Sequence, residues 1–187
     1  MADRHSVEQC PNDRLDALLG EIRQDERRGM RELDTVLGVY PHDPRLHFLH
    51  GSLLAGRQDY AAARAAMQRA VELARNYAVA RFQLGFLLLT SGEPIAAQET
   101  WGPLHALPDE HYLRLFVTGL THLIHDEFSD AVRLLEQGIS RNQENAPMNR
   151  DMQLIIEEAR KKSAGKGGAV SSVDLLLQQA ALKSSRH

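Results

Sequence analysis

Residues 44–77 read PRLHFLHGSLLAGRQDYAAARAAMQRAVELARNY, and the segments 78–111 and 112–145 repeat this pattern at the same length. Three columns recur every 34 residues: Gly51, Gly85 and Gly119; Ala63, Ala97 and Ala131; and Phe48, Phe82 and Phe116. Three residue types in phase over three copies indicate an internal repeat. Within each copy, apolar residues recur at helical spacing on both sides of a break containing Gly, Asp or Pro, which predicts a pair of antiparallel helices.

Proline positions refine where these helices begin and end. Asp43 is expected to cap the first helix of the first copy, with Pro44 as its first residue, and Pro94 is expected to open the second helix of the second copy. Pro103 lies inside that second helix, so it should kink the helix or end it early. The third copy is expected to start at Pro108 and Asp109.

With a small residue in the middle of its first helix and an Ala early in its second, the 34-residue unit resembles that of the tetratricopeptide-repeat family. Tyr60 and Phe128 match the family's aromatic just ahead of that Ala, whereas Pro94 replaces it in the second copy, and the usual closing Pro is missing after the first two copies. The resemblance implies an all-α fold, a right-handed superhelix of antiparallel helix pairs.

Flanking segments extend the predicted repeat domain to residues 1–162. Residues 10–43 resemble a degenerate first unit, with Leu18, Leu19, Leu33, Val36 and Pro41 at its apolar and closing positions. Its charged segment DERRGMREL is expected to form a solvent-facing turn region. Residues 147–162 place Met148, Met152, Ile155 and Ala159 on one face, which predicts a helix that caps the last pair.

The resemblance also implies that the first helices line a concave groove with their fifth, ninth and twelfth positions. These include Phe48, Ser52, Phe82, Phe86, Leu89, Phe116, Leu120 and Leu123. Such an apolar groove suits an amphipathic helix or an extended apolar peptide of a protein partner. The alternative is that the phenylalanines are packing residues inside the helix pairs.

The C-terminal segment has two parts. Residues 163–172 have the Gly and Ser content of a flexible linker. Residues 173–187 contain a short amphipathic helical pattern, with Val173, Leu176, Leu177 and Ala180 on one face. We expect this helix to dock in the groove, in cis or in a neighbouring copy, and to compete with the ligand. The alternatives are an additional cap or a disordered end.

Charge and composition exclude several functions. The net charge is −3, and residues 160–187 hold six cationic side chains against Asp174, so the remaining body is acidic and is not expected to bind nucleic acid. No apolar run is long enough for a membrane span or a signal peptide. With a single cysteine, Cys10, no internal disulfide is possible, and a cytoplasmic location is expected.

No catalytic, cofactor or metal site is expected from the sequence. The pairs His47 and His50, and His122 and His125, lack a third ligand at an evident spacing, and the AGKGG segment at 164–168 lacks the Ser or Thr of a phosphate loop. The leading interpretation is a non-catalytic protein-interaction adaptor. The alternative is a chaperone of a secretion or assembly system that shields an apolar client segment. An enzyme is the third class, without a visible constellation of nucleophile and base.

Overall fold

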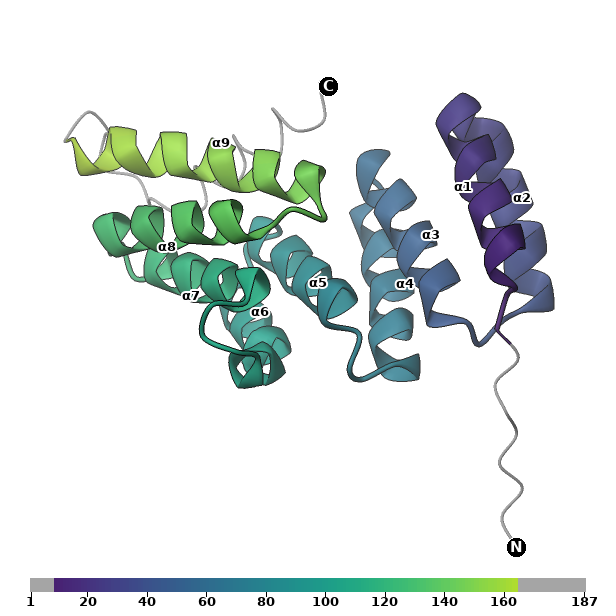
Figure 1. The fold of residues 1–187 in the computed structure, drawn as a ribbon, viewed down its shortest axis with the longest axis horizontal. Helices are drawn as coiled ribbons and strands as arrows, with labels where there is room; N and C mark the ends of the chain where they lie inside the picture. The colour runs from purple at the N-terminus through teal and green to yellow at the C-terminus, as the bar shows by residue number, and fades with distance from the viewer. Residues whose placement is uncertain (1–8, 165–187) are drawn as a thin grey trace, which may run out of the picture. The chain divides into compact units, whose positions relative to one another are not determined.

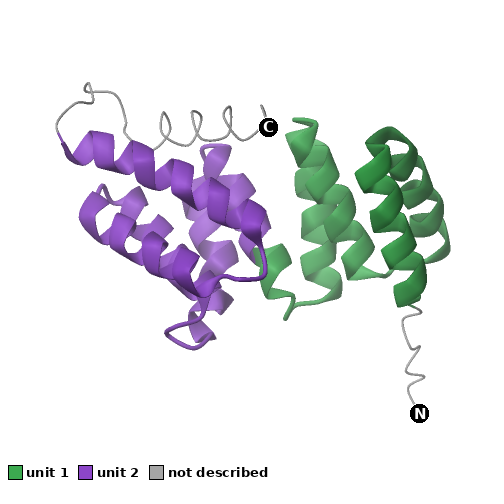
Figure 2. Cartoon of the chain, turned by 45° about the horizontal axis from the view of Figure 1, so that its top comes forward, with its two compact units in different colours: residues 1–81 green, residues 82–187 purple. Residues whose placement is uncertain are grey.

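The computed structural model describes residues 9–164, a range that contains helices and no strand. It divides into two compact units, residues 1–81 and 82–187, which Figure 2 colours separately. The all-α fold class predicted from the repeat is confirmed. Each unit is described below by itself, and the helix labels follow Figure 1.

Unit 1 consists of two helix pairs and the beginning of a fifth helix. Its helices are α1 (Asn12–Gln24), α2 (Glu26–Val39), α3 (Pro44–Gly56) and α4 (Tyr60–Leu73). α1 packs against α2, and α3 packs against α4, and each pair is joined by a short turn that makes its helices antiparallel (Figure 1). α2 also contacts α3, so the two pairs share one core.

Unit 2 contains the interrupted pair, the third pair and a final long helix. Its elements are α6 (Pro94–Trp101), the 3₁₀ helix η1 (Gly102–Ala106), α7 (Tyr112–Ile124), α8 (Phe128–Arg141) and α9 (Ala146–Ser163). α5 (Ala78–Thr90) crosses the boundary between the units. α8 packs between α7 and α9. Met148, Met152, Ile155 and Ala159 are all buried, as their helical spacing predicts.

The repeated glycines lie where the two helices of a pair touch. The contacts join Gly51 to Met67, Gly85 to Trp101 and Gly119 to Leu135. A Cβ atom added at Gly85 would lie 2.5 Å from Cδ1 of Trp101. Real Cβ atoms do not approach other carbons so closely, and hence the absence of a side chain allows the helices to pack at this distance. Met67, Trp101 and Leu135 form a further column with the same spacing of 34 residues.

Pro103 shortens the second helix of the second copy, as predicted. α6 ends at Trp101, and the chain continues as the 3₁₀ helix η1 because Pro103 has no N–H for the α-helical ladder. The Trp101 ring is completely buried, and its Nε1–H donates a hydrogen bond to the Phe82 carbonyl at 3.0 Å. Trp101 therefore ties the end of α6 to the middle of α5.

The start of α7 differs from the sequence expectation. The helix begins at Tyr112, not at Pro108 or Asp109, and the His111 side chain accepts the Leu113 N–H at 3.2 Å as an N-cap. Histidine is an uncommon cap, so the pattern of favoured capping residues did not reveal it. The Arg114 guanidinium donates to the Leu107 carbonyl at 2.7 Å and fixes the preceding loop.

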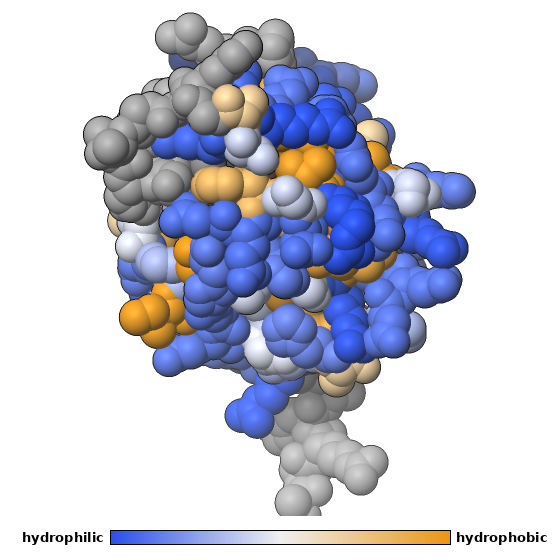
Figure 3. All heavy atoms as spheres, turned by 90° about the vertical axis from the view of Figure 1, so that its left-hand side faces the viewer, coloured by the Kyte–Doolittle hydropathy of each residue, from blue (hydrophilic) through white to orange (hydrophobic). Residues whose placement is uncertain are grey.

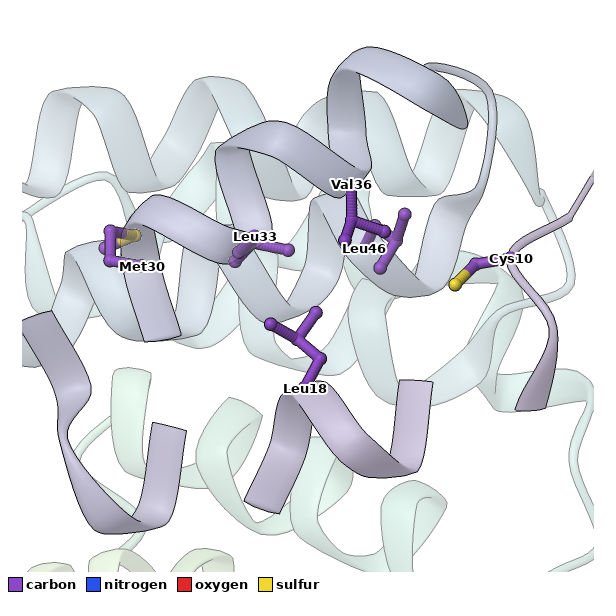
Figure 4. Close-up of a cluster of buried hydrophobic side chains, with 6 residues drawn as sticks. All are labelled: Cys10, Leu18, Met30, Leu33, Val36 and Leu46. Carbon is purple, nitrogen blue, oxygen red and sulfur yellow. The ribbon is translucent and has the colours of Figure 1, made fainter. Parts of the chain in front are cut away.

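The charged DERRGMREL segment was wrongly expected to be a turn region. The turn between α1 and α2 consists of Asp25 alone, whose side chain caps α2 by accepting the Arg28 N–H at 3.0 Å. The following residues are helical, and they place Met30 and Leu33 in the first core cluster (Figure 4). The charged side chains of this segment lie on the solvent-facing side of α2.

A hydrogen-bonded ion pair holds the start of the described chain against α3. The Asp43 carboxylate is fully buried, caps α3 as predicted and accepts the Cys10 N–H at 2.9 Å. The Arg45 guanidinium pairs with Asp43 at 2.7 Å and also donates to the Cys10 carbonyl and to the Asn12 side chain. We call these four residues the Asp43 clamp. Cys10 packs into the first core cluster, which Figure 4 shows.

A second buried polar residue, Asn142, joins α8 to α9. Its side-chain amide donates to the Asn145 carbonyl at 3.1 Å and to the Asn149 side chain at 2.8 Å. Its Oδ1 accepts the Glu144 and Asn145 backbone N–H groups. The Asn142 side chain therefore makes four hydrogen bonds in and around this turn.

Replacing Asn142 with alanine is expected to lower the free energy of unfolding by about 2 kcal/mol, because two backbone donors in a partly buried turn lose their acceptor. The measurement is urea unfolding followed by far-UV circular dichroism. Gln143→Ala, at the exposed neighbouring position, serves as the control and should leave the midpoint unchanged. Equal midpoints for both variants would contradict the structural role of Asn142.

Candidate protein-binding surface

The predicted groove residues of unit 1, Phe48 and Ser52, are half-buried on α3. The Phe48 ring meets the Tyr77 ring edge-on, with centroids 5.3 Å apart. Ser52 Oγ donates back to the Phe48 carbonyl at 2.9 Å. Leu49 and Leu53 pack instead against the first core cluster. The Phe48 side of α3 therefore retains partial exposure to solvent.

The predicted groove residues of unit 2 are mostly buried. Phe82, Leu89, Phe116, Leu120 and Leu123 are each 0 or 1% exposed. The rings of Phe82 and Phe116 lie 6.0 Å apart, and the Trp101 ring stacks on Phe82 at 6.2 Å. The alternative considered from the sequence, that phenylalanines of this column pack inside the protein, describes the positions of Phe82 and Phe116. These five side chains stabilise the core and offer little surface to a partner.

Phe86 is the predicted groove residue of unit 2 that keeps partial exposure. Its ring stacks on the buried Phe82 ring, with centroids 6.1 Å apart and planes 8° from parallel. Thr90 is also half-buried and its Oγ1 donates to the Phe86 carbonyl at 3.0 Å. Phe86 is thus a partly exposed aromatic side chain that stacks on a buried aromatic ring.

Apolar side chains are otherwise scattered thinly over the surface. The large hydrophobic residues classed as exposed within residues 9–164 are Val39, Tyr60 and Ile95, and Ile95 has 73% of its surface in solvent. Figure 3 shows one face of the molecule, on which hydrophilic side chains predominate and hydrophobic ones form small separate groups. Single exposed apolar residues are normal in soluble proteins, so Ile95 by itself marks no site.

The histidines considered as metal ligands have local polar neighbours. His47 Nε2 lies 2.8 Å from the Pro41 carbonyl, and His50 Nε2 lies 3.7 Å from Asp34. Burial lowers the pKa of His50 more than the nearby Asp34 carboxylate raises it. His122 pairs with Glu127 across the turn before α8. In the described part of the chain, no three His, Cys, Asp or Glu side chains come together as a metal site would require.

Cys10 is buried, although charged residues lie close to it in the sequence. The sequence places it in a charged terminal segment, but its side chain is 2% exposed. Burial, and next the neighbouring Asp43 carboxylate, raise the pKa of the Cys10 thiol. A buried thiol with a raised pKa is a poor nucleophile, because the reactive species is the thiolate. The AGKGG segment lies, apart from Ala164, outside the described residues.

No protein-family model and no curated protein sequence matches the chain. The solved structures to which the chain is similar include "MamA 41-end from Desulfovibrio magneticus RS-1" and "MamA RS-1 ArsTM double mutant". Each has 13% sequence identity and a TM-score of 0.58, over 91% of this chain and 92% of the MamA chain. No helix within residues 9–164 combines the length and apolar character of a membrane span. This likeness shows the fold alone, a tetratricopeptide-repeat-like array of helix pairs.

Proposed function

We propose that this chain is a non-catalytic protein-interaction module that binds an apolar helix or peptide through partly exposed aromatic residues on the first helices of its pairs, above all Phe86 on α5. The repeated helix pairs and the MamA-like fold support an interaction or scaffold role. Helical repeats generally present extended surfaces to protein partners, because each pair adds a similar face to the array. The ligand is expected to bury apolar side chains against the half-exposed aromatic residues of these helices.

The main support for the proposal is the partial exposure of the Phe86 ring, which is stacked on Phe82. Its ring rests on the fully buried Phe82 ring, so its rotamer is restricted before a partner arrives. A preorganised aromatic side chain loses little conformational entropy on binding and buries a large apolar area. Aromatic residues of this kind are enriched among the positions that dominate binding energy. Phe48, packed on Tyr77, is the half-buried counterpart in unit 1.

Replacing Phe86 with alanine should reduce capture of a protein partner from native lysate by at least about tenfold, as expected for an aromatic hot spot. Immobilised wild-type and variant proteins would be compared by quantitative mass spectrometry. Ile95→Ala is the matched control, because it removes an apolar side chain that is 73% exposed on α6. Phe82→Ala is unsuitable, since the buried ring supports the core. Equal capture by the Phe86 and Ile95 variants would contradict the proposed surface.

In this proposal the C-terminal segment competes with the protein partner for the same binding surface. Val173, Leu176, Leu177 and Ala180 lie outside the described residues. α9 ends at Ser163, so removing residues 165–187 leaves every described helix complete. We expect the truncated protein to bind the captured partner more tightly than the full chain in a titration. Unchanged affinity would contradict competition by this segment.

A further inference from the structure

An open hollow of about 690 Å³ lies in unit 1 between α2 and the end of α3. Its lining consists of Glu26, Arg27, Met30, Arg31, Asp34 and Arg57. Arg57 follows the last residue of α3, and its Nε donates to the Glu26 carboxylate at 2.8 Å, which links the two walls. The lining contains no aromatic residue.

The charges of the hollow are only partly compensated. Glu26 is engaged by Arg57, and Asp34 lies 3.7 Å from His50. Arg27 and Arg31, by contrast, have no carboxylate within ion-pair distance among the described residues, although the charge of Arg31 helps to lower the pKa of the nearby Asp25 carboxyl group. They stand four residues apart on the same face of α2, where two like charges repel each other. A pair of carboxylates at matching separation would relieve this repulsion.

One mostly buried apolar side chain, that of Met30, lies beside the two arginines. Met30 is 7% exposed and belongs to the first core cluster, so its thioether forms part of the floor. Arg27, Met30, Arg31 and Asp34 follow the spacing i, i+3, i+4 and i+7, a continuous stripe along one helix face. The flexible methionine side chain adapts to differently shaped apolar ligands. The stripe therefore combines two unpaired cations with one apolar contact.

We propose that this hollow binds an acidic helical segment of a protein partner, with carboxylates four residues apart facing Arg27 and Arg31 and an apolar side chain facing Met30. Guanidinium groups recognise carboxylates with paired hydrogen bonds, which favours arginine at such a position. This second interaction surface goes beyond the proposed aromatic surface, because it uses other residues and another ligand chemistry.

The test is fluorescence anisotropy at low ionic strength with a labelled alanine-based helical peptide that carries Glu, Leu and Glu at i, i+3 and i+4. Its control peptide has Gln in place of both Glu residues. The Arg27→Gln/Arg31→Gln variant should bind the acidic peptide about fivefold more weakly than the wild type, given the modest strength of exposed ion pairs. Arg64→Gln/Arg75→Gln removes the same charge from other exposed positions of unit 1 and should leave binding unchanged.

Four results would overturn the proposal. The first is equal or absent binding of the Glu and Gln peptides. The second is an equal loss in both arginine variants, which would indicate a general effect of net charge. The third is displacement of the peptide by a single-stranded oligonucleotide of equal charge at equal concentration. Self-association by sedimentation, lost only in the Arg27→Gln/Arg31→Gln variant, would identify a second copy of the chain as the occupant and would also contradict the proposal.

Discussion

Replacing Gly85 with leucine is expected to lower the free energy of unfolding by about 3 kcal/mol, at the upper end of overpacking costs. The new Cβ would lie 2.5 Å from Cδ1 of Trp101, and the rest of the side chain would need still more space. The indole would have to move, which would break its hydrogen bond to the Phe82 carbonyl. Urea unfolding monitored by far-UV circular dichroism measures the loss, and the fluorescence of the single tryptophan reports the displacement of its ring.

Gly20→Leu is the matched control for this substitution. Gly20 lies inside α1, and a Cβ added there would meet no atom within 4 Å. Glycine is a poor helix former, so the control is expected to gain up to about 1 kcal/mol through helix propensity. A Gly85 variant as stable as the Gly20 variant would show that the glycine column has no packing role.

Replacing Asp43 with alanine is expected to cost about 3 kcal/mol, the lower end of the range for breaking a buried ion pair. The buried Cys10 N–H would lose its acceptor, α3 would lose its cap, and Arg45 would keep its charge without its partner. The side chain of Arg45 is 27% exposed, which allows water to reduce that last penalty. Because the chain has one cysteine, the rate at which a thiol reagent modifies Cys10 reports directly whether the Asp43 clamp opens.

Asp59→Ala provides the comparison for the Asp43 variant. Asp59 also caps a helix, α4, by accepting the Ala62 N–H at 3.2 Å, but it is exposed. Its loss should cost about 1 kcal/mol, the usual value for an N-cap, with no change in the rate of Cys10 modification. Equal rates in the wild type and in both variants would contradict the clamp.

The stability that the Asp43 clamp contributes should also depend on pH. Burial alone would raise the pKa of Asp43, but the hydrogen bonds from the Arg45 guanidinium and the neighbouring backbone N–H groups lower it below its usual value. The unfolded chain therefore takes up the proton first as the pH falls. The stability that Asp43 contributes is complete above the unfolded pKa, about 4, and is lost as the pH falls through the lower folded value. The stability difference between wild type and Asp43→Ala should shrink in that acidic window.

Local rules predicted the features that depend on neighbours in sequence. The helix starts at Pro44 and Pro94 and the early end of α6 before Pro103 follow from backbone chemistry within a few residues, whereas the 34-residue period is read directly from recurring residues. Asp43 was predicted as a cap for the same reason. Its second role was not predictable, because its partner Cys10 lies 33 residues earlier and meets it only after α1 and α2 have packed.

Exposure was the property that the sequence could not supply. Phe48 and Phe82 occupy equivalent repeat positions, yet Phe48 is half-buried and Phe82 is 0% exposed. The difference arises from neighbours: Phe82 has aromatic rings from Phe86, Trp101 and Phe116 around it, whereas the ring paired with Phe48 is Tyr77. Periodicity defines which residues share a helix face but not how completely the next helix covers that face.

The Asp43 clamp has a consequence for anyone who shortens this protein. The first helix begins at Asn12, so a fragment designed from helix boundaries alone would start there and discard Cys10. Such a fragment would keep all of α1 but would leave the buried Asp43 carboxylate without the Cys10 N–H and Arg45 without the Cys10 carbonyl. A useful fragment should therefore retain at least two residues ahead of the helix, since these backbone atoms act as part of the neighbouring repeat.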